Sequence, residues 1–413
     1  MEGRRSPAGL TGLTGLTGLT GLWVVTRLVL LLYVFRVYVF PGPDVTTDVS
    51  VIYRGWYDVL SAGAYPQGDV TWQYPPAAAL AILSPGLLAF LDYASAFFVL
   101  VLLADLAVLV LLLTAGRSPR GALVWVAGVP LLGPTVYARY DLMVTAVAVA
   151  ALLAGVRRPR VMGALVGLGA LLKVWPVLLL AGARRRAQGA AAVTVGALGA
   201  LFALAAPGAF GFLSSQRDRG TEVESLGALV FHVARHLGWS GEVRLHYGSV
   251  EFLGPHVDAV SEAALGLTAA AFGWLLLWRL RARRSAPHTL ADAALTAVLL
   301  FTVTSRVISP QYLVWLVGLA AVCRCFPGSR MGPPTVLVLA ASPVTVLEFP
   351  VWFGHVVASD ALGLTLLFLR NGLLVAATVT AAVRLWRSTV PRAAAPPAEP
   401  GRAARAGHAQ VPS

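Results

Sequence analysis

Long apolar segments recur along almost the whole chain and are separated by short polar connections. Each segment is roughly 15–25 residues long, which suits a helix that crosses the hydrocarbon core of a bilayer. The boundaries of the apolar runs predict full helices over residues 19–40, 94–114, 121–137, 141–155, 189–207, 260–280, 289–305, 311–325, 333–350 and 359–385.

Two apolar segments contain features that interrupt a helix. Residues 76–91 include Pro85 followed by Gly86, and we expect a short or re-entrant segment there. Residues 161–183 include Lys173 and Pro176, and we expect two half-helices that meet near this pair, because proline removes a backbone donor. Irregular backbone at membrane depth is tolerated where it lines a cavity. Both interruptions therefore indicate a site near one face of the membrane.

Composition supports a membrane-embedded body. Apolar residues make up 57% of the 413 residues and charged residues only 12%, whereas soluble domains average about 45–50% and about 25%. The expected fold is an all-α polytopic membrane protein with roughly 10–12 transmembrane helices. We expect one membrane domain over residues 19–390, after a low-complexity segment at residues 1–18.

The basic residues are distributed unevenly along the chain. The formal charge is +13, and short connections hold clusters of arginine: Arg117, Arg120, Arg157, Arg158, Arg160, Arg184, Arg185, Arg186, Arg279, Arg281, Arg283, Arg284, Arg324 and Arg330. Arginine in short loops indicates the cytoplasmic side, so the excess charge does not indicate a nucleic-acid partner. We expect both termini in the cytoplasm, with a retained first helix and a disordered tail at 391–413. Loops 41–75 and 208–258 then lie outside the plasma membrane.

The first outer loop is acidic and aromatic. Residues 41–75 carry Asp44, Asp48, Asp58 and Asp69 against Arg54, together with six aromatic side chains. Loops of this length are usually functional or disordered, and the aromatic residues argue against disorder. Carboxylates beside aromatic platforms suit a sugar. The alternative interpretation is a solvated loop in which the aspartates cap short helices.

Isolated cations form a second group of candidates. Lys173 is the single lysine of the chain and lies in an apolar stretch with no acid adjacent in sequence. An ionisable residue within the membrane indicates a functional site, although a lysine can also snorkel to the interface. Arg306 lies among polar residues in a short outer link and suits an anion, with snorkelling as the alternative. Arg139 and Asp141 lie near each other and could pair.

The remaining polar residues favour structural roles. Residues 226–237 have the spacing of an amphipathic helix on the membrane surface. His232 and His236 share a face of it but have no third ligand, and Cys323 and Cys325 are too close for an ordinary disulfide. Glu348 and His355 flank an outer link and suit the interface.

Several of these pieces, in this order, resemble the actinobacterial polyprenyl-phosphate-mannose-dependent mannosyltransferases of glycosyltransferase family 87, which belong to the membrane-embedded GT-C class. The resemblance covers about residues 45–315. The matching positions are Asp48 with Tyr53, Gly63 with Pro66, Tyr74-Pro75-Pro76, Lys173 with Pro176, Arg217 and Arg219 with Glu224-Ser225, and Ser309 with Gln311-Tyr312.

The resemblance implies a GT-C-type bundle that moves a sugar, mannose in that family, from a polyprenyl-phosphate donor to a lipid or glycan acceptor. It makes Asp48 the expected base for an inverting transfer, with Lys173, Arg306 and Arg217 as candidates to bind the donor phosphate. The expected substrate-binding residues are Asp44, Tyr53, Tyr74, Asp141, Glu224, Gln311, Tyr312 and His355. The acidic loop has no Asp-x-Asp pair, so we expect neither a metal nor a cofactor.

Two other function classes are compatible with a polytopic chain. A secondary transporter would also use broken helices and charges at the midplane, but no inverted repeat is evident and transport would not need a large outer loop. A non-catalytic membrane scaffold of envelope biosynthesis is the second alternative. The sequence leaves the sugar and the acceptor open.

Overall fold

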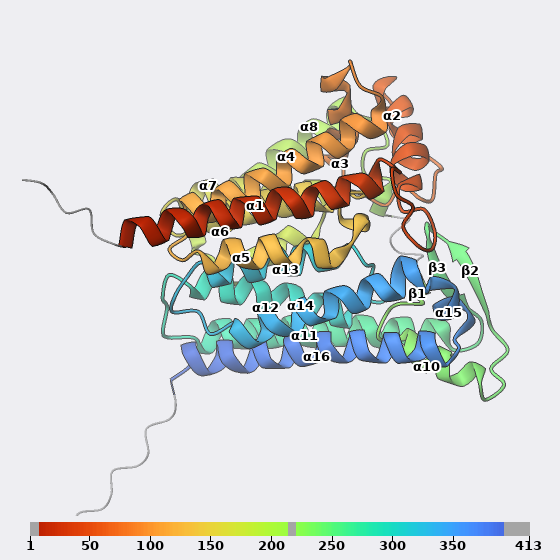
Figure 1. The fold of residues 1–413 in the computed structure, drawn as a ribbon. Coiled ribbons are helices and arrows are strands. Elements are labelled where there is room, and N and C mark those ends of the chain that lie inside the picture. The colour runs from red at the N-terminus through yellow and green to blue at the C-terminus, as the bar shows by residue number, and fades with distance from the viewer. Residues whose placement is uncertain (1–7, 214–219, 392–413) are drawn as a thin grey trace, which may run out of the picture.

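The computed structural model describes residues 8–213 and 220–391. Most of them form helices that run side by side in an elongated bundle (Figure 1). The helices of the bundle are α1 (Ala8–Val34), α4 (Tyr93–Thr114), α5 (Arg120–Gly128), α6 (Asp141–Gly155), α7 (Pro159–Leu172), α8 (Arg185–Ala205), α11 (Val257–Arg281), α12 (Thr289–Thr304), α13 (Tyr312–Arg324), α14 (Gly332–Val346) and α16 (Ala361–Thr389).

The bundle has the dimensions of a membrane protein. Within the described residues, six helical segments are long and apolar enough to cross a bilayer, and six shorter apolar helical segments of 10–17 residues accompany them. The protein is therefore an all-α polytopic membrane protein, as its composition predicts. The expected low-complexity start is helical from Ala8 onward in α1. The tail after Pro391, expected to be disordered, lies outside the described residues.

Smaller elements gather at one end of the bundle (Figure 1). They are α2 (Arg54–Ser61), α3 (Ala78–Leu83), α10 (Ala228–Arg235), α15 (Phe353–Ala358), β1 (Thr221–Glu222), β2 (Glu242–His246) and β3 (Ser249–Leu253). Short π-helical or 3-10 segments complete the fold: η1 (Asp48–Tyr53), η2 (Ser84–Leu88), η3 (Pro130–Leu132), η4 (Pro134–Val136), η5 (Trp175–Gly182) and η6 (Leu347–Val351). The arginine-rich connections between α4 and α5, α6 and α7, α11 and α12, and α13 and α14 lie at the opposite end (Figure 1).

Both expected interruptions are present. α3 ends at Leu83 and passes into the 3-10 turn that contains Pro85. α7 ends at Leu172, and Lys173 adopts extended backbone angles before the 3-10 segment η5 begins. The second half of residues 161–183 is therefore a 3-10 segment, where an α-helix was expected. The predicted helix 121–137 is also divided, because prolines begin η3 and η4 after α5.

A small antiparallel sheet replaces much of the expected second outer loop. Its strand order is β1-β3-β2, and β2 pairs with β3 across a two-residue turn with His246 opposite Ser249. Both turn residues, Tyr247 and Gly248, have positive φ angles of 47° and 76°, which is the geometry of a tight hairpin. The amphipathic helix expected at 226–237 is α10, and the sheet was not predicted.

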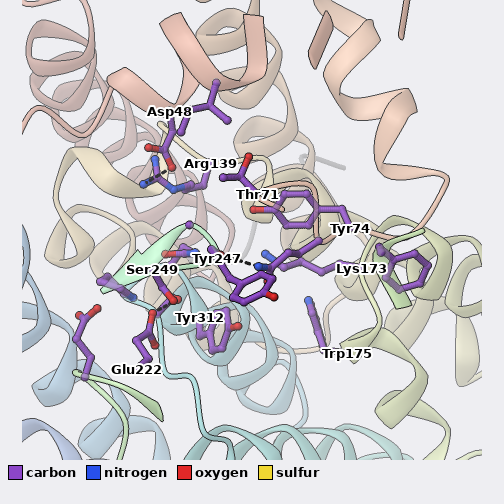
Figure 2. Close-up of a pocket in the computed structure, with 18 of the residues that line it drawn as sticks. Asp48, Thr71, Tyr74, Arg139, Lys173, Trp175, Glu222, Tyr247, Ser249 and Tyr312 are labelled. Carbon is purple, nitrogen blue, oxygen red and sulfur yellow. Dashed lines mark hydrogen bonds and ion pairs between the residues drawn. The ribbon is translucent and has the colours of Figure 1, made fainter. Parts of the chain in front are cut away.

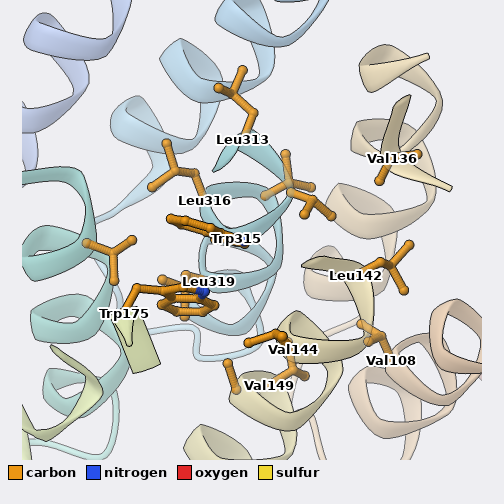
Figure 3. Packing of buried hydrophobic residues seen from close by; sticks show 14 of the residues in the cluster. Val108, Val136, Leu142, Val144, Val149, Trp175, Leu313, Trp315, Leu316 and Leu319 are labelled. Atoms are coloured by element: carbon orange, nitrogen blue, oxygen red, sulfur yellow. The ribbon is translucent and has the colours of Figure 1, made fainter. Parts of the chain in front are cut away.

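The apolar core contains stacked tryptophans. Trp315 of α13 stacks on Trp175 of η5 with ring centroids 4.9 Å apart, among buried leucines of α13 (Figure 3). On its other face Trp315 stacks on Tyr312 at 4.0 Å. This stack joins the broken segment after α7 to α13, and so holds the backbone that follows Lys173.

One ion pair lies deep in the bundle. Arg27 of α1 and Asp105 of α4 are 2.8 Å apart, and both side chains are at most 1% exposed. Asp105 also accepts hydrogen bonds from Trp23, Trp125 and Tyr137. Because the carboxylate has four donors around it, the charge is compensated where water is absent.

Candidate functional site

The end of the bundle that carries the small elements contains a cavity of about 570 Å³. Its wall combines the first outer loop, the break after α7, the sheet, the link before α13, and η6 with α15. Side chains of opposite charge face it (Figure 2). The polar lining residues are Asp48, Thr71, Gln73, Tyr74, Arg139, Lys173, Glu222, Glu224, Tyr247, Ser249, Ser309, Gln311 and Tyr312.

Asp48 is held by an arginine. It is the first residue of the π-helical segment η1, and its carboxylate lies 2.7 Å from Arg139 Nη2. The Asp48 side chain is 36% exposed, whereas Arg139 is nearly buried and also donates to the carbonyls of Val45 and Ala138. The arginine is thus fixed by backbone, and it fixes the carboxylate at the cavity edge.

Lys173 is surrounded by rings and backed by a carboxylate. Its Nζ atom lies 2.7 and 2.9 Å from the two carboxylate oxygens of Asp141, which also accepts a hydrogen bond from Trp315. Four aromatic rings have centroids within 6 Å of the ammonium: Tyr74, Tyr140, Tyr312 and Trp315. Such contacts favour a cation. The extended backbone at Lys173 turns its side chain into this cage, toward the cavity.

The sheet forms a further wall. The tip of the β2–β3 hairpin reaches the first outer loop, where the side-chain amide of Gln73 donates to the carbonyl of Tyr247 at 2.6 Å. Glu222 of β1 holds the link before α13, because its carboxylate accepts from the Ile308 amide at 2.7 Å and the Ser309 hydroxyl at 3.0 Å. These contacts close the cavity between segments that are far apart in sequence.

Three buried polar atoms of the cavity wall have no hydrogen-bond partner within the described residues: the Tyr53 hydroxyl, Trp175 Nε1 and Glu224 Oε1. Burial raises the pKa of Glu224, and the nearby carboxylates of Glu222 and Glu348 raise it further. An unpaired buried polar group costs about 1–3 kcal/mol. The wall therefore suits a ligand that supplies polar groups at several points.

Most of the residues expected from the sequence meet at this cavity. Those that line it are Asp48, Tyr53, Tyr74, Lys173, Glu224, Gln311 and Tyr312. Asp141 lies directly behind Lys173 and contacts the cavity only through it. Asp48 and Lys173 therefore line the same cavity.

Other expected residues lie outside the lining. Asp44 pairs with Arg36 and accepts hydrogen bonds from the amide and hydroxyl of Thr46, in the turn that precedes η1. His355 pairs with Asp360 at 2.5 Å on an exposed surface. The backbone carbonyl of Arg306 accepts a hydrogen bond from the Glu222 amide, and its side chain is not part of the lining. Arg217 lies outside the described residues.

One pairing and one placement expected from the sequence are wrong. Arg139 and Asp141 do not pair with each other, because Arg139 binds Asp48 and Asp141 binds Lys173. Glu348 is not interfacial: it is fully buried against Arg370 of α16.

His232 is buried rather than interfacial. Its ring nitrogens bond to the Val223 carbonyl and the Ser359 hydroxyl. Burial lowers the pKa of His232 to about 4. No group of three or more histidine, cysteine, aspartate or glutamate side chains in the described residues could hold a metal ion.

Sequence reasoning gave Arg139 the wrong partner and did not single out two further wall residues, Glu222 and Tyr247. Arg139 carried a usable signal, because it stands in a polar interruption between two predicted helices. Glu222 belongs to a connection whose strands were not recognised. Tyr247 acts through a tertiary contact to Gln73, 174 positions away, which no local pattern indicates.

Comparison with known proteins gives one match. The family model described as "Glycosyltransferase family 87" matches residues 72–310, which is more than half of the chain. Neither the curated proteins nor the solved structures gave a match. The matched region includes Lys173, Arg139 and the sheet, and it ends at the link before α13.

Proposed function

The chain belongs to glycosyltransferase family 87 and is a membrane glycosyltransferase, and from this premise we propose that it uses a polyprenyl-phosphate sugar as donor. The sugar, which we propose is mannose, passes to a hydroxyl of a lipid or glycan acceptor in the described cavity. The observation that carries this proposal is that Asp48 and Lys173, a carboxylate and a caged ammonium, line the same cavity.

We propose Asp48 as the general base. Its carboxylate takes the proton of the acceptor hydroxyl while that oxygen attacks the anomeric carbon, and the bond from this carbon to the phosphate oxygen breaks. Attack from the face opposite the phosphate inverts the anomeric carbon. Arg139 would act as a positioning residue, since it holds the carboxylate at 2.7 Å and is itself fixed by two backbone carbonyls.

The donor phosphate would bind at Lys173. The phosphate leaves with the electron pair of the broken bond, so negative charge grows on it in the transition state, and a preorganised cation stabilises that charge. Of the two predicted phosphate-binding residues that the structure describes, Lys173 and Arg306, Lys173 lines the cavity and Arg306 does not. A phosphate is a good leaving group, so one carboxylate suffices, in contrast to glycoside hydrolysis.

We place the cavity on the extracytoplasmic side of the plasma membrane. The arginine-rich connections lie at the opposite end of the bundle (Figure 1), and arginine-rich short loops face the cytoplasm. A polyprenyl-phosphate sugar would then present its head group at the outer surface, while the isoprenoid chain stays among the membrane lipids.

The test compares two aspartates of the same outer loop. In purified protein, Asp48→Asn should lower sugar transfer from a polyprenyl-phosphate mannose donor by at least about a hundredfold, because the amide cannot accept the proton. Its donor affinity should stay close to that of the wild type. Asp58→Asn is the matched control, since Asp58 is exposed on α2 and pairs with Arg54 outside the cavity lining.

An active Asp48→Asn protein would remove the proposed base. A wild-type protein that transfers no sugar from any polyprenyl-phosphate donor would overturn the donor class. Vesicles reconstituted in one orientation, with a membrane-impermeant acceptor added outside, test the proposed side of the membrane.

A further inference from the structure

The cavity has a second wall whose chemistry differs from that around Lys173. Figure 2 shows Glu222 and Ser249 on one side of the view, and Lys173 with Trp175 on the other. The Glu222 carboxylate accepts a hydrogen bond from Ser309, and Glu224, Phe349 and Phe353 also line the cavity. None of these described lining residues is a cation, in contrast to the wall around Lys173.

Glu224 is the central residue of this second wall. Its side chain is 5% exposed, and its Oε1 atom has no hydrogen-bond partner within the described residues. The backbone is held from α16, because Arg370 Nη2 donates to the Glu224 carbonyl at 2.9 Å. Arg370 is itself held by an ion pair with the buried Glu348. The carboxyl group is thus presented to the cavity on a rigid support.

The charge around Glu224 favours its neutral form. Burial raises the pKa of Glu224, and the carboxylates of Glu222 and Glu348 add to this effect. A protonated carboxyl group can both donate and accept a hydrogen bond. A hydroxyl group has the same two capacities, so the two groups can pair in either direction.

Two aromatic rings complete the wall. Phe349 of η6 and Phe353 of α15 meet edge to face, with centroids 5.1 Å apart, and both rings line the cavity. Neither ring carries a polar atom, and both are partly exposed. Rings of this kind suit the C–H face of a pyranose, while a carboxyl group binds its hydroxyls.

We propose that Glu224, Phe349 and Phe353 form the acceptor subsite, and that it takes an uncharged, hydroxyl-bearing sugar ring. The inference rests on the proposed function, because it assumes that the donor phosphate occupies the wall around Lys173. The subsite selects against acidic sugars, since a carboxylate placed there would meet the carboxyl groups of Glu222 and Glu224. The described residue Arg370, which lies behind this wall, is already paired with the buried Glu348. The acceptor is therefore a neutral glycan or the neutral sugar of a glycolipid.

The first experiment separates acceptor binding from donor binding. In the transfer assay, Glu224→Ala should raise the acceptor KM by roughly tenfold or more, because it removes a hydrogen-bonding group from a buried subsite. The donor KM should stay unchanged. Glu224→Gln should keep most of the acceptor affinity, since an amide also donates and accepts. Glu262→Ala, an exposed change on α11, is the matched control.

Phe353→Leu provides a variant at the edge of the cavity that keeps an apolar side chain but removes the ring. It should also raise the acceptor KM and leave the donor KM unchanged. An unchanged acceptor KM in both Glu224→Ala and Phe353→Leu, or equal increases in the two KM values, would overturn the subsite. Thermal unfolding in detergent verifies that each variant is folded.

The second experiment needs no turnover, so it still decides the matter if the proposed donor class fails. Saturation-transfer NMR measures binding of neutral methyl hexosides, with methyl glucuronide as the charged counterpart. Binding of a neutral glycoside that Glu224→Ala abolishes, together with no binding of the glucuronide, supports the subsite. Absence of binding by every neutral glycoside, or equal binding of the glucuronide, contradicts it.

Discussion

Two of the ion pairs in the described residues use the same chemistry in different surroundings. Arg27–Asp105 lies inside the bundle, at most 1% exposed, with every partner supplied by the protein. Lys173–Asp141 has an equally buried carboxylate, but its ammonium is 12% exposed and faces the cavity. A charged side chain inside a membrane protein is thus not enough to identify a functional site. What distinguishes Lys173 is access to a space that a ligand can enter.

The largest expected effect concerns the structural pair. Arg27→Met leaves the Asp105 carboxylate buried without its counter-charge, and breaking such a pair costs about 3–5 kcal/mol. We expect a lower unfolding temperature and a lower yield of folded protein, with normal transfer activity per folded molecule. Denaturation in detergent combined with an active-site titration measures both. An Arg27→Met protein of normal stability would contradict the structural role of the Arg27–Asp105 pair.

The next effect concerns the pair at the cavity. Lys173→Met should lower transfer by about a hundred- to a thousandfold, because it removes a preorganised cation from the departing phosphate. The unfolding temperature should change less than in Arg27→Met. The Lys173 ammonium is 12% exposed at the cavity, so water can take its place beside the buried Asp141 carboxylate. Lys173→Arg should restore part of the activity. A Lys173→Met protein that is unstable yet fully active per folded molecule would make this pair structural as well.

The smallest effect extends the comparison to His232, a buried group away from the cavity. It is neutral in the folded protein, with a pKa of about 4, but takes up a proton near pH 6.5 when unfolded. Its stabilising contribution is therefore complete above pH 6.5 and is lost as the pH falls toward 4. From pH 7.5 to 5.5 we expect a loss of about 1 kcal/mol. In thermal unfolding, His232→Gln should reduce the dependence of stability on pH. The transfer activity per folded molecule should not change with the protonation of His232.

The sequence predicts the parts of the fold that depend on local composition. Apolar runs locate the helices, and Pro85 and Pro176 mark both interruptions because proline lacks the backbone donor. The sheet was missed because its strands have only two to five residues, embedded in a connection that also contains a helix. A usable signal existed in the alternation of polar and apolar residues over 242–246 and 249–253, on the two sides of Gly248, because two alternating runs with a glycine between them are typical of a hairpin.

The sequence predicts two central residues of the candidate site, but it does not predict which side chains they contact. Asp48 and Lys173 stand out because carboxylates in an aromatic loop and a lysine in an apolar run are both unusual. Their partners were not predictable: Arg139 lies 91 positions after Asp48, and Asp141 lies 32 before Lys173. Which charges meet depends on how helices pack, and proximity in sequence led instead to the pairing of Arg139 with Asp141.

The single lysine makes the cavity chemically addressable without any engineering. An amine-selective acylating reagent can modify only the ε-amine of Lys173 and the α-amine of the chain, and peptide mapping separates the two. While the ammonium is held against Asp141 it is a poor nucleophile. In a native membrane, faster labelling would therefore report that the Lys173–Asp141 ion pair has opened. Slower labelling would report that a ligand in the cavity shields the amine from the reagent.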